Sequence, residues 1–369
     1  MQVFACLNRV GVNSNGDTNM KTKSPLIVFV IAAILLTSCR FNRPDERSGN
    51  PTSGPNTPAV TAPPVAFTSE AQTQTQVLQF APGRNDYILE VDGTPREFIL
   101  HIPSGYDPNI PTPVVVMIHG TNQSGAVMYE NTGWADTAEA ENIIVAFPTG
   151  WKYPLVGENG LHEKWNTPGT ATEVEPGTEL KDDVKFIRTM IEDLKVTFTV
   201  DNKRIFASGF SNGGGFVITR LIPEMNDVFA AFSNVGSGLI GKGEVEDVSV
   251  KINASLYSIL GTNDNKLAEG QGIPVPFAFT EQEIVNDPIF SAMFDKTIAL
   301  LNLQKSYMVE SDTDFTRFTF AKSNAGADNE YVFMMIRGMG HVYPSEDKSR
   351  AGVNAADIFW DFFLKHPKP

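Results

Sequence analysis

Cysteine is almost absent from this sequence of 369 residues. The only two cysteines, Cys6 and Cys39, lie near the start, so we expect neither a disulfide nor a spare thiol in the part that folds. The chain also has no H-E-x-x-H motif, no cysteine pair and no histidine cluster, which excludes the usual zinc-site patterns. The glycine run Gly213-Gly214-Gly215 lacks a Walker lysine and dinucleotide-binding spacing. We therefore expect no metal and no cofactor.

Positive charge is in short supply as well. The sequence has 29 lysines and arginines against 43 aspartates and glutamates, for a formal net charge of −14. This balance argues against a nucleic-acid partner and against electrostatic attraction to an anionic membrane. The unbroken apolar stretch from Leu26 to Leu36 is too short to span a bilayer. Its length is typical of the apolar core of a signal peptide.

The residues around that stretch resemble a secretion signal. Met20-Lys21-Thr22-Lys23 is basic and precedes it, and Leu36-Thr37-Ser38-Cys39 follows at once. The second motif resembles a bacterial lipobox, in which cleavage exposes the cysteine for lipidation; an ordinary secretory signal with an incidental cysteine is the alternative. We expect residues 1–39 to be a signal peptide, with Met20 as an alternative start. The protein would then be extracytoplasmic, either lipid-anchored to a bacterial membrane or secreted.

The segment after the signal has a different composition. Residues 40–80 are rich in Pro, Ser, Thr, Asn and Gly and show no apolar periodicity. Such a segment cannot bury a core, so it predicts a disordered tether. Residues 81–369 are long enough for one large folded domain, and we expect that domain to be a monomer.

Short apolar segments alternate with helical patterns along this domain. Alternating residues around Asp92-Gly93 predict a β-hairpin over 86–103. Continuous apolar segments predict buried strands at Val114–Ile118, Ile143–Phe147, Ile205–Ser208, Phe229–Val235, Ser255–Leu260 and Tyr331–Ile336. Helices are predicted at Met128–Asn142, Asp182–Leu194, Ile289–Leu303 and Ala355–Leu364. This alternation predicts the α/β class, with a mostly parallel central sheet and helices on both faces. A loop over 152–180 is a candidate functional loop, and 265–289 is a second irregular stretch.

The pentapeptide Gly209-Phe210-Ser211-Asn212-Gly213 matches the pattern G-x-S-x-G between a predicted strand and a predicted helix. In that pattern the serine occupies a strained turn, which small neighbours permit, and its hydroxyl stands exposed above the sheet. A bare G-x-S-x-G also occurs by chance as a glycine-rich turn. Taken alone, the motif leaves Ser211 as either a nucleophile or an ordinary turn residue.

Two more polar residues, Asp264 and His341, each come shortly after a predicted strand. Active sites of open parallel sheets lie beyond the carboxyl ends of the strands. The chain order Ser211, Asp264, His341 is the order in which α/β-hydrolases present nucleophile, acid and base. A serine hydroxyl needs a neighbouring base, and a histidine oriented by a carboxylate meets that need. Asp312 and Asp314 stay open as alternative acids.

The tripeptide His119-Gly120-Thr121 follows the first long buried strand. In α/β-hydrolases this loop supplies one backbone N–H of the oxyanion hole, and the residue after the nucleophile supplies the other. The predicted hole is therefore formed by the N–H groups of Thr121 and Asn212. We expect His119 to be a structural histidine under the hole rather than a second base.

With these residues in place, the chain resembles the secreted esterases of the feruloyl esterase and poly(3-hydroxybutyrate) depolymerase group. The resemblance covers roughly Tyr87 to Leu364. It rests on His119-Gly120, Gln123-Ser124-Gly125, Pro148-Thr149-Gly150-Trp151, Trp165-Asn166, Asp182-Asp183-Val184, Ser211-Asn212-Gly213-Gly214, Gly261-Thr262-Asn263-Asp264 and Gly340-His341. It implies the α/β-hydrolase fold and a Ser-His-Asp triad that hydrolyses carboxylic esters through an acyl-enzyme. The implied substrates are feruloyl or acetyl esters of plant polysaccharide, or a polyester similar to a polyhydroxyalkanoate. Thr121 and Lys164 stand where the group often has cysteines, which leaves the substrate open.

Trp151 and Trp165 are the candidate substrate-binding residues. Their loop follows the strand next to the proposed oxyanion hole, so it should overhang the Ser211 hydroxyl. Aromatic rings there would bind a flat acyl group or a sugar ring. The alternative for Trp165 is that it anchors the loop.

Two other classes of protein share some of these sequence features. A serine peptidase of the prolyl-oligopeptidase type has the same triad order, but it usually carries a propeller domain that the first 80 residues cannot form. A non-catalytic surface lipoprotein could keep the fold and bind ligands. Loss of a triad residue would have favoured that interpretation, and none is missing.

The expected cellular location is tested by replacing Cys39, the predicted site of lipidation. Cys39→Ala should block lipidation and leave a soluble or mislocalised form, because the lipid would be the only anchor. Fractionation of cells that express each form measures this. Equal retention of both forms in the membrane fraction would rule out the lipoprotein interpretation.

Overall fold

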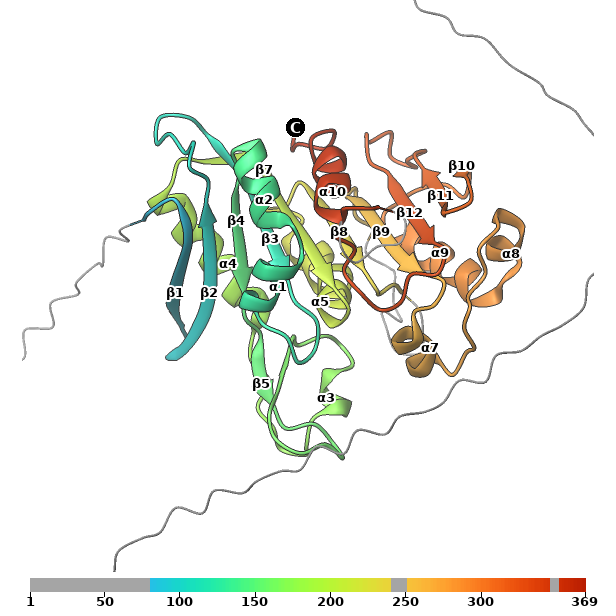
Figure 1. The fold of residues 1–369 in the computed structure, drawn as a ribbon, viewed down its shortest axis with the longest axis horizontal. Helices are drawn as coiled ribbons and strands as arrows, with labels where there is room; N and C mark the ends of the chain where they lie inside the picture. The colour runs from blue at the N-terminus through green and yellow to red at the C-terminus, as the bar shows by residue number, and fades with distance from the viewer. Residues whose placement is uncertain (1–79, 240–250, 346–351) are drawn as a thin grey trace, which may run out of the picture. The chain divides into compact units, whose positions relative to one another are not determined.

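The computed structural model describes residues 80–239, 251–345 and 352–369 (Figure 1). The predicted signal peptide, Cys39 and the predicted tether up to residue 79 lie outside the described residues. Within the described ranges, no helix is long and apolar enough to cross a membrane.

The described residues form a ten-stranded central sheet in the order β1-β2-β4-β3-β7-β8-β9-β12-β11-β10. Its middle strands are all parallel to one another. They are β3 (Thr112–Ile118), β4 (Ile144–Pro148), β7 (Val200–Phe210), β8 (Ala231–Val235), β9 (Ser255–Gly261) and β12 (Tyr331–Ile336). Each contains one of the predicted buried segments or most of it. The prediction of a mostly parallel sheet is confirmed.

Antiparallel strands extend the sheet at both edges. The predicted hairpin is confirmed as β1 (Gly83–Val91) and β2 (Thr94–Ile102). Its turn residues Asp92 and Gly93 have φ angles of 51° and 70°, as a tight hairpin turn of the primed type requires. The opposite edge is formed by β11 (Phe315–Phe320) and β10 (Met308–Ser311), which were not predicted. In β11 alternate side chains, Thr316, Phe318 and Phe320, are buried.

Helices cover both faces of the sheet, as predicted (Figure 1). Successive residues of a strand point to opposite faces, so Val114 and Val116 of β3 pack in one core while Val115 and Met117 pack in the other. One face is covered by α1 (Gly125–Asn131), α2 (Trp134–Glu141) and α10 (Ala355–Phe363). The other is covered by α4 (Asp183–Thr197), α5 (Asn212–Phe216), α6 (Ile222–Met225) and α9 (Pro288–Leu300), with the π-helical segment η1 (Val217–Leu221) between α5 and α6.

Some predicted boundaries were wrong. The helix predicted at Met128–Asn142 is two helices, because Gly133 has a φ of 77° and breaks the run between α1 and α2. The loop predicted over 152–180 contains regular structure: β5 (Trp151–Tyr153), β6 (His162–Lys164) and α3 (Thr170–Glu173). The irregular stretch 265–289 likewise contains α7 (Asn265–Gln271) and α8 (Glu281–Asn286).

Parallel strands bring their carboxyl ends to one edge of the sheet. Ser211 directly follows β7, Asp264 lies three residues past the end of β9, and His341 lies five residues past the end of β12. Figure 1 shows α5, α7 and the β5 hairpin gathered at this same end of the sheet. The fold therefore brings the polar residues predicted from the sequence to one region.

Candidate active site

Ser211 connects β7 to α5 in a backbone conformation that non-glycine residues rarely adopt. Its φ is 53° and its ψ is −123°. The Ser211 amide donates to the carbonyl of Val235 at the end of β8, at 2.8 Å. Such a backbone conformation costs about 1–3 kcal/mol of folding free energy, and it persists only where the surrounding structure holds the residue in place. The turn is therefore the strained strand-to-helix elbow that the pentapeptide predicts.

The glycines beside Ser211 are required by close backbone contacts. A Cβ added to Gly209 would lie 2.5 Å from the carbonyl oxygen of Gly213, and one added to Gly213 would lie 2.3 Å from the carbonyl oxygen of His119. Gly215, two residues further, has open space around it. The elbow can therefore form only where the first two of these positions lack a side chain.

The three predicted polar residues form one hydrogen-bonded chain. The Oγ of Ser211 lies 2.8 Å from Nε2 of His341, and Nδ1 of His341 lies 2.9 Å from both carboxylate oxygens of Asp264. When Nδ1–H donates to the carboxylate, Nε2 carries the free lone pair and accepts the serine proton. Asp264 is fully buried. The three side chains therefore have the hydrogen bonds that a nucleophile, a base and an orienting acid would require.

Backbone hydrogen bonds hold the acid and base loops against each other. The amide of Asn263 donates to the Met339 carbonyl at 2.9 Å, and the amide of Gly338 donates to Thr262 Oγ1 at 2.8 Å. Oδ1 of Asp264 also caps α7 by accepting from the Leu267 amide at 2.9 Å. The carboxylate is thus fixed before any substrate binds.

Asp312 and Asp314, the alternative acids, lie in the turn between β10 and β11. Asp312 accepts hydrogen bonds from the amides of Asp314 and Phe315, at 2.7 and 2.9 Å. Among the described residues neither carboxylate contacts His341, whereas Asp264 does. The geometry favours Asp264.

The predicted oxyanion loop lies directly beside Ser211. A Cβ added to Gly120 would lie 3.0 Å from the Cβ of Ser211. No acceptor for the backbone N–H of Thr121 or of Asn212 is found in the described part of the chain. The next residue, Asn122, is held by the β5–β6 hairpin: its amide donates to the Glu163 carbonyl at 2.9 Å. Two uncommitted donors therefore stand close to the serine hydroxyl.

His119 is fully buried and ties two loops together. Its Nε2 accepts from the Gly150 amide at 2.8 Å, so Nδ1 carries the proton and donates to the Gly120 carbonyl at 2.6 Å. Both nitrogens are thus satisfied in the neutral ring. Burial lowers the pKa of His119 to about 4. These contacts fit the structural role predicted for it.

The prediction that Trp165 contacts substrate is wrong, because its side chain is 0% exposed. The indole stacks on Phe216, with ring centroids 5.3 Å apart, and its N–H donates to the His119 carbonyl at 2.9 Å. The Trp165 amide donates to Oδ1 of Asn212 at 2.8 Å. Trp165 therefore anchors the loop, which is the alternative that the sequence left open, and it holds the residue that follows Ser211.

Trp151 remains partly exposed. It lines a cavity of about 420 Å³ with Arg96 and Leu161. The Lys181 ammonium lies 5.6 Å from the centre of its ring. In the described ranges Trp151 has no hydrogen bond or ring contact with Ser211, Asp264 or His341. It remains a candidate for substrate binding at a distance from the serine.

A buried ion pair that the sequence did not reveal supports this arrangement. Arg96 donates to Oδ1 of Asp183 at 2.7 Å, and the two side chains are 2% and 0% exposed. Oδ2 of Asp183 accepts from the amide of Asn166 at 2.7 Å, next to Trp165. Burial raises the pKa of Asp183, an effect that the Arg96 guanidinium opposes. The pair therefore positions the Trp165-Asn166 segment that holds Asn212. In the sequence, Asp183 stood out only as part of the motif Asp182-Asp183-Val184, with no role assigned to it.

Comparisons with known proteins find similarity to esterases and to a polyester depolymerase. No protein-family model matches the chain. The chain is 26% identical over 183 residues to a bifunctional acetylxylan esterase/xylanase of Neocallimastix patriciarum, a match covering 50% of this chain and 23% of the relative. It is 33% identical over 160 residues to feruloyl esterase C of Emericella nidulans (43% and 52%). It is 30% identical over 138 residues to poly(3-hydroxyalkanoate) depolymerase C of Paucimonas lemoignei (37% and 30%).

The matches therefore span between 23% and 52% of the length of these three relatives. Among solved structures, an S-formylglutathione hydrolase from Agrobacterium tumefaciens aligns with a TM-score of 0.50 at 13% identity, covering 78% of this chain and 97% of that one. The fold is the α/β-hydrolase fold, as the resemblance implied.

Acidification should weaken the fold through His119. Its folded pKa of about 4 lies below the ordinary histidine value of 6.5, so the unfolded chain binds the extra proton between these limits. The stability from this group is complete above pH 6.5 and is lost as the pH falls toward 4. Between pH 7 and 5 the loss in unfolding free energy is about 2 kcal/mol. Urea unfolding at both pH values, for the wild type and for His119→Gln, measures it. The variant should lack this part of the pH dependence; an equal dependence in both proteins would contradict the assignment.

Proposed function

We propose that this protein is a serine esterase that hydrolyses carboxylic esters through an acyl-enzyme on Ser211. The observation that carries the proposal is the hydrogen-bonded chain from Ser211 Oγ through His341 to the buried Asp264. It lies at the carboxyl end of a parallel sheet, where enzymes of this architecture place their active sites. The names of the relatives, which include acetylxylan esterase, feruloyl esterase and polyhydroxyalkanoate depolymerase, support ester hydrolysis.

Under this proposal each group of the site has a role in the reaction. As Ser211 Oγ attacks the ester carbonyl, its proton passes to Nε2 of His341, and Asp264 stabilises the imidazolium that forms. The negative charge on the carbonyl oxygen is bound by the N–H groups of Thr121 and Asn212. His341 then gives its proton to the departing alcohol oxygen, leaving the acyl group on Ser211. A water molecule, deprotonated by the same nitrogen, attacks the acyl-enzyme and releases the acid.

The names of the relatives support a proposal for the substrate class. We propose acetyl or feruloyl esters of plant polysaccharide, or a polyester similar to a polyhydroxyalkanoate. A partly exposed aromatic ring such as that of Trp151 offers a stacking surface to a sugar or an acyl ring. The intact hydrogen-bonded chain gives no support to a purely ligand-binding lipoprotein.

The organisation of the whole chain is part of the proposal. A signal peptide over 1–39, lipidation at Cys39 and a tether over 40–80 would hold a monomeric catalytic domain, 81–369, outside the cytoplasm. The lipid would then be the only contact with a membrane.

The acid assignment gives a test with a matched control. Asp264→Asn keeps the shape and the cap of α7, because asparagine also caps helices, but it removes the charge that fixes the tautomer of His341. We expect kcat for an acetyl or feruloyl ester to fall on the order of 10⁴-fold. Asp312→Asn, which changes the alternative acid, should keep wild-type activity.

Circular dichroism of both variants checks that the fold is retained. A nearly silent Asp264→Asn beside an inactive Asp312→Asn would transfer the role of acid to Asp312. If Ser211→Ala, measured in the same assay, retained most of the wild-type rate, the proposed function would be wrong.

A further inference from the structure

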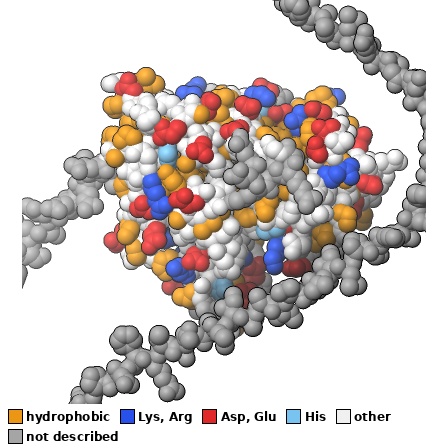
Figure 2. Space-filling view, viewed as in Figure 1, with side chains coloured by type: hydrophobic (Ala, Val, Ile, Leu, Met, Phe, Trp, Pro, Cys, Tyr) orange, Lys and Arg blue, Asp and Glu red, His pale blue; other side chains and the backbone are white. Residues whose placement is uncertain are grey.

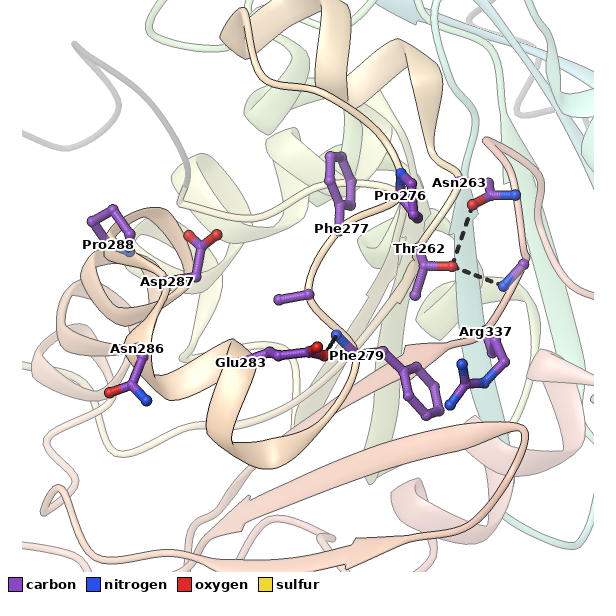
Figure 3. A pocket seen from close by; sticks show the side chains of 12 residues that line it. Thr262, Asn263, Pro276, Phe277, Phe279, Glu283, Asn286, Asp287, Pro288 and Arg337 are labelled. Atoms are coloured by element: carbon purple, nitrogen blue, oxygen red, sulfur yellow. Dashed lines mark hydrogen bonds between the residues drawn. The ribbon is translucent and has the colours of Figure 1, made fainter.

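A second cavity, of about 790 Å³, lies against the acid and base loops (Figure 3). Its wall includes Thr262 and Asn263, which lead from β9 to Asp264, and Arg337 and Gly338, which lead from β12 toward His341. The opposite wall comes from the connection between α7 and α8 and from the start of α9. The cavity is therefore formed largely by the stretch over 265–289, which the sequence left without a role.

Arg337 lines this cavity, and its guanidinium is held in place on one side only. Its Nε donates to the Thr313 carbonyl at 2.8 Å, and its guanidinium carbon lies 3.7 Å from the centre of the Phe279 ring. These two contacts fix the group, but no described residue accepts a hydrogen bond from its terminal nitrogens. All the other described arginines pair with a carboxylate: Arg84, Arg96, Arg188, Arg204, Arg220 and Arg317. Arg337 forms no ion pair with a described residue.

The two carboxylates that share the cavity, Glu283 and Asp287, are each engaged at a helix end. Glu283 accepts from the amides of Phe279 and Thr280 at 3.2 and 3.0 Å (Figure 3). Asp287 caps α9, accepting from the amides of Ile289 and Phe290 at 2.8 and 3.2 Å. Each carboxylate therefore has one oxygen engaged at a helix end, Oε2 of Glu283 and Oδ1 of Asp287. Elsewhere, on the face drawn in Figure 2, basic side chains are interspersed with acidic ones. The pKa of Glu283 is lowered by its hydrogen bonds from Thr280 and Phe279 and, to a smaller extent, by the charge of Arg337, but Glu283 and Arg337 form no ion pair or hydrogen bond. The terminal nitrogens of this immobilised arginine therefore suit an external carboxylate.

The cavity lies on the side of Ser211 from which the alcohol departs. In the sheet, the strand order β3-β7-β8-β9-β12 places the oxyanion loop on one side of Ser211 and the Asp264 and His341 loops on the other. His341 protonates the departing alcohol, so the alcohol extends toward β9 and β12. One strand separates β7 from β9, which puts the near wall of the cavity roughly 10 Å from the serine. A disaccharide or a short hydroxyacid chain spans that distance.

We propose that this cavity binds a carboxylate on the alcohol portion of the ester, with Arg337 as the residue that recognises it. The inference rests on the proposed esterase function and adds a specificity to it. Two substrate sources carry this chemistry. One is a polysaccharide with a uronic acid near the esterified sugar, and the other is a hydroxyacid oligomer whose chain end is a free carboxylate.

The experiment compares esters that differ only in that carboxylate. One pair is an acetylated xylo-oligosaccharide with and without a glucuronic acid branch, and the other is a 3-hydroxybutyrate trimer as the free acid and as its methyl ester. The wild type should show a kcat/KM about tenfold higher for the acid member of the pair that matches the natural source, as expected for one charge-assisted contact. Arg337→Gln should remove this preference and leave the neutral ester unchanged. Arg188→Gln, which alters an exposed arginine already paired with Asp227, should behave as the wild type.

The outcomes distinguish the carboxylate specificity of the cavity from the esterase function on which it rests. A preference within the sugar pair identifies the uronic acid source, and a preference within the trimer pair identifies the chain end. Hydrolysis without any preference in either pair overturns the inference and leaves the esterase function standing. Equal losses of Arg337→Gln on acid and neutral esters also overturn it. If the wild type hydrolyses none of the four esters, the inference is overturned, and the esterase function is decided separately by the feruloyl ester and Ser211→Ala assay described above.

Discussion

The left-handed backbone of Ser211 is the constraint on which the site depends. A φ of 53° at a residue with a side chain is strained, and the strain is held by the strands on either side. The Ser211 amide is bonded to Val235 of β8, and α5 begins at the next residue. The contact between Gly213 and the His119 carbonyl brings the predicted oxyanion loop close to the elbow. The serine hydroxyl is thereby presented to His341 without loop movement.

The support behind the elbow is a series of buried polar contacts rather than apolar packing alone. His119 joins Gly120 to Gly150, Trp165 joins His119 to Asn212, and Asp183 joins Asn166 to Arg96. A buried ion pair contributes little net stability, because the desolvation of both charges offsets their attraction. The Arg96–Asp183 pair acts here by fixing the position of Asn166. Removing one partner would leave an unpaired buried charge directly behind the segment that holds Asn212.

Much of the site could be predicted from the sequence because its signals are local. The motif around Ser211 encodes the elbow, and the residues after two buried strands gave Asp264 and His341. The parallel strands could be predicted too, since each is a continuous apolar run. What could not be predicted depends on contacts between distant segments. Asp182 and Asp183 are identical neighbours in the sequence, yet the first caps α4 while the second is buried against Arg96, 87 residues away.

The same limit explains the incorrect prediction for Trp165. An aromatic residue in a long loop near a site has the same sequence signature whether it points outward or inward. Only the packing of Phe216 and His119 around it determines that it is buried. The edge strands β10 and β11 were missed for a related reason: half of the side chains of β11 are buried, so it shows alternation and not a continuous apolar run.

The central claim is that Ser211 is a nucleophile activated by His341. Its most direct test is to treat the folded protein with a fluorophosphonate and to locate the adduct by mass spectrometry of its peptides. The account predicts one phosphonylated residue, Ser211, with no adduct on the Ser211→Ala variant. An adduct on another serine, or none on wild-type protein that remains folded, would contradict it.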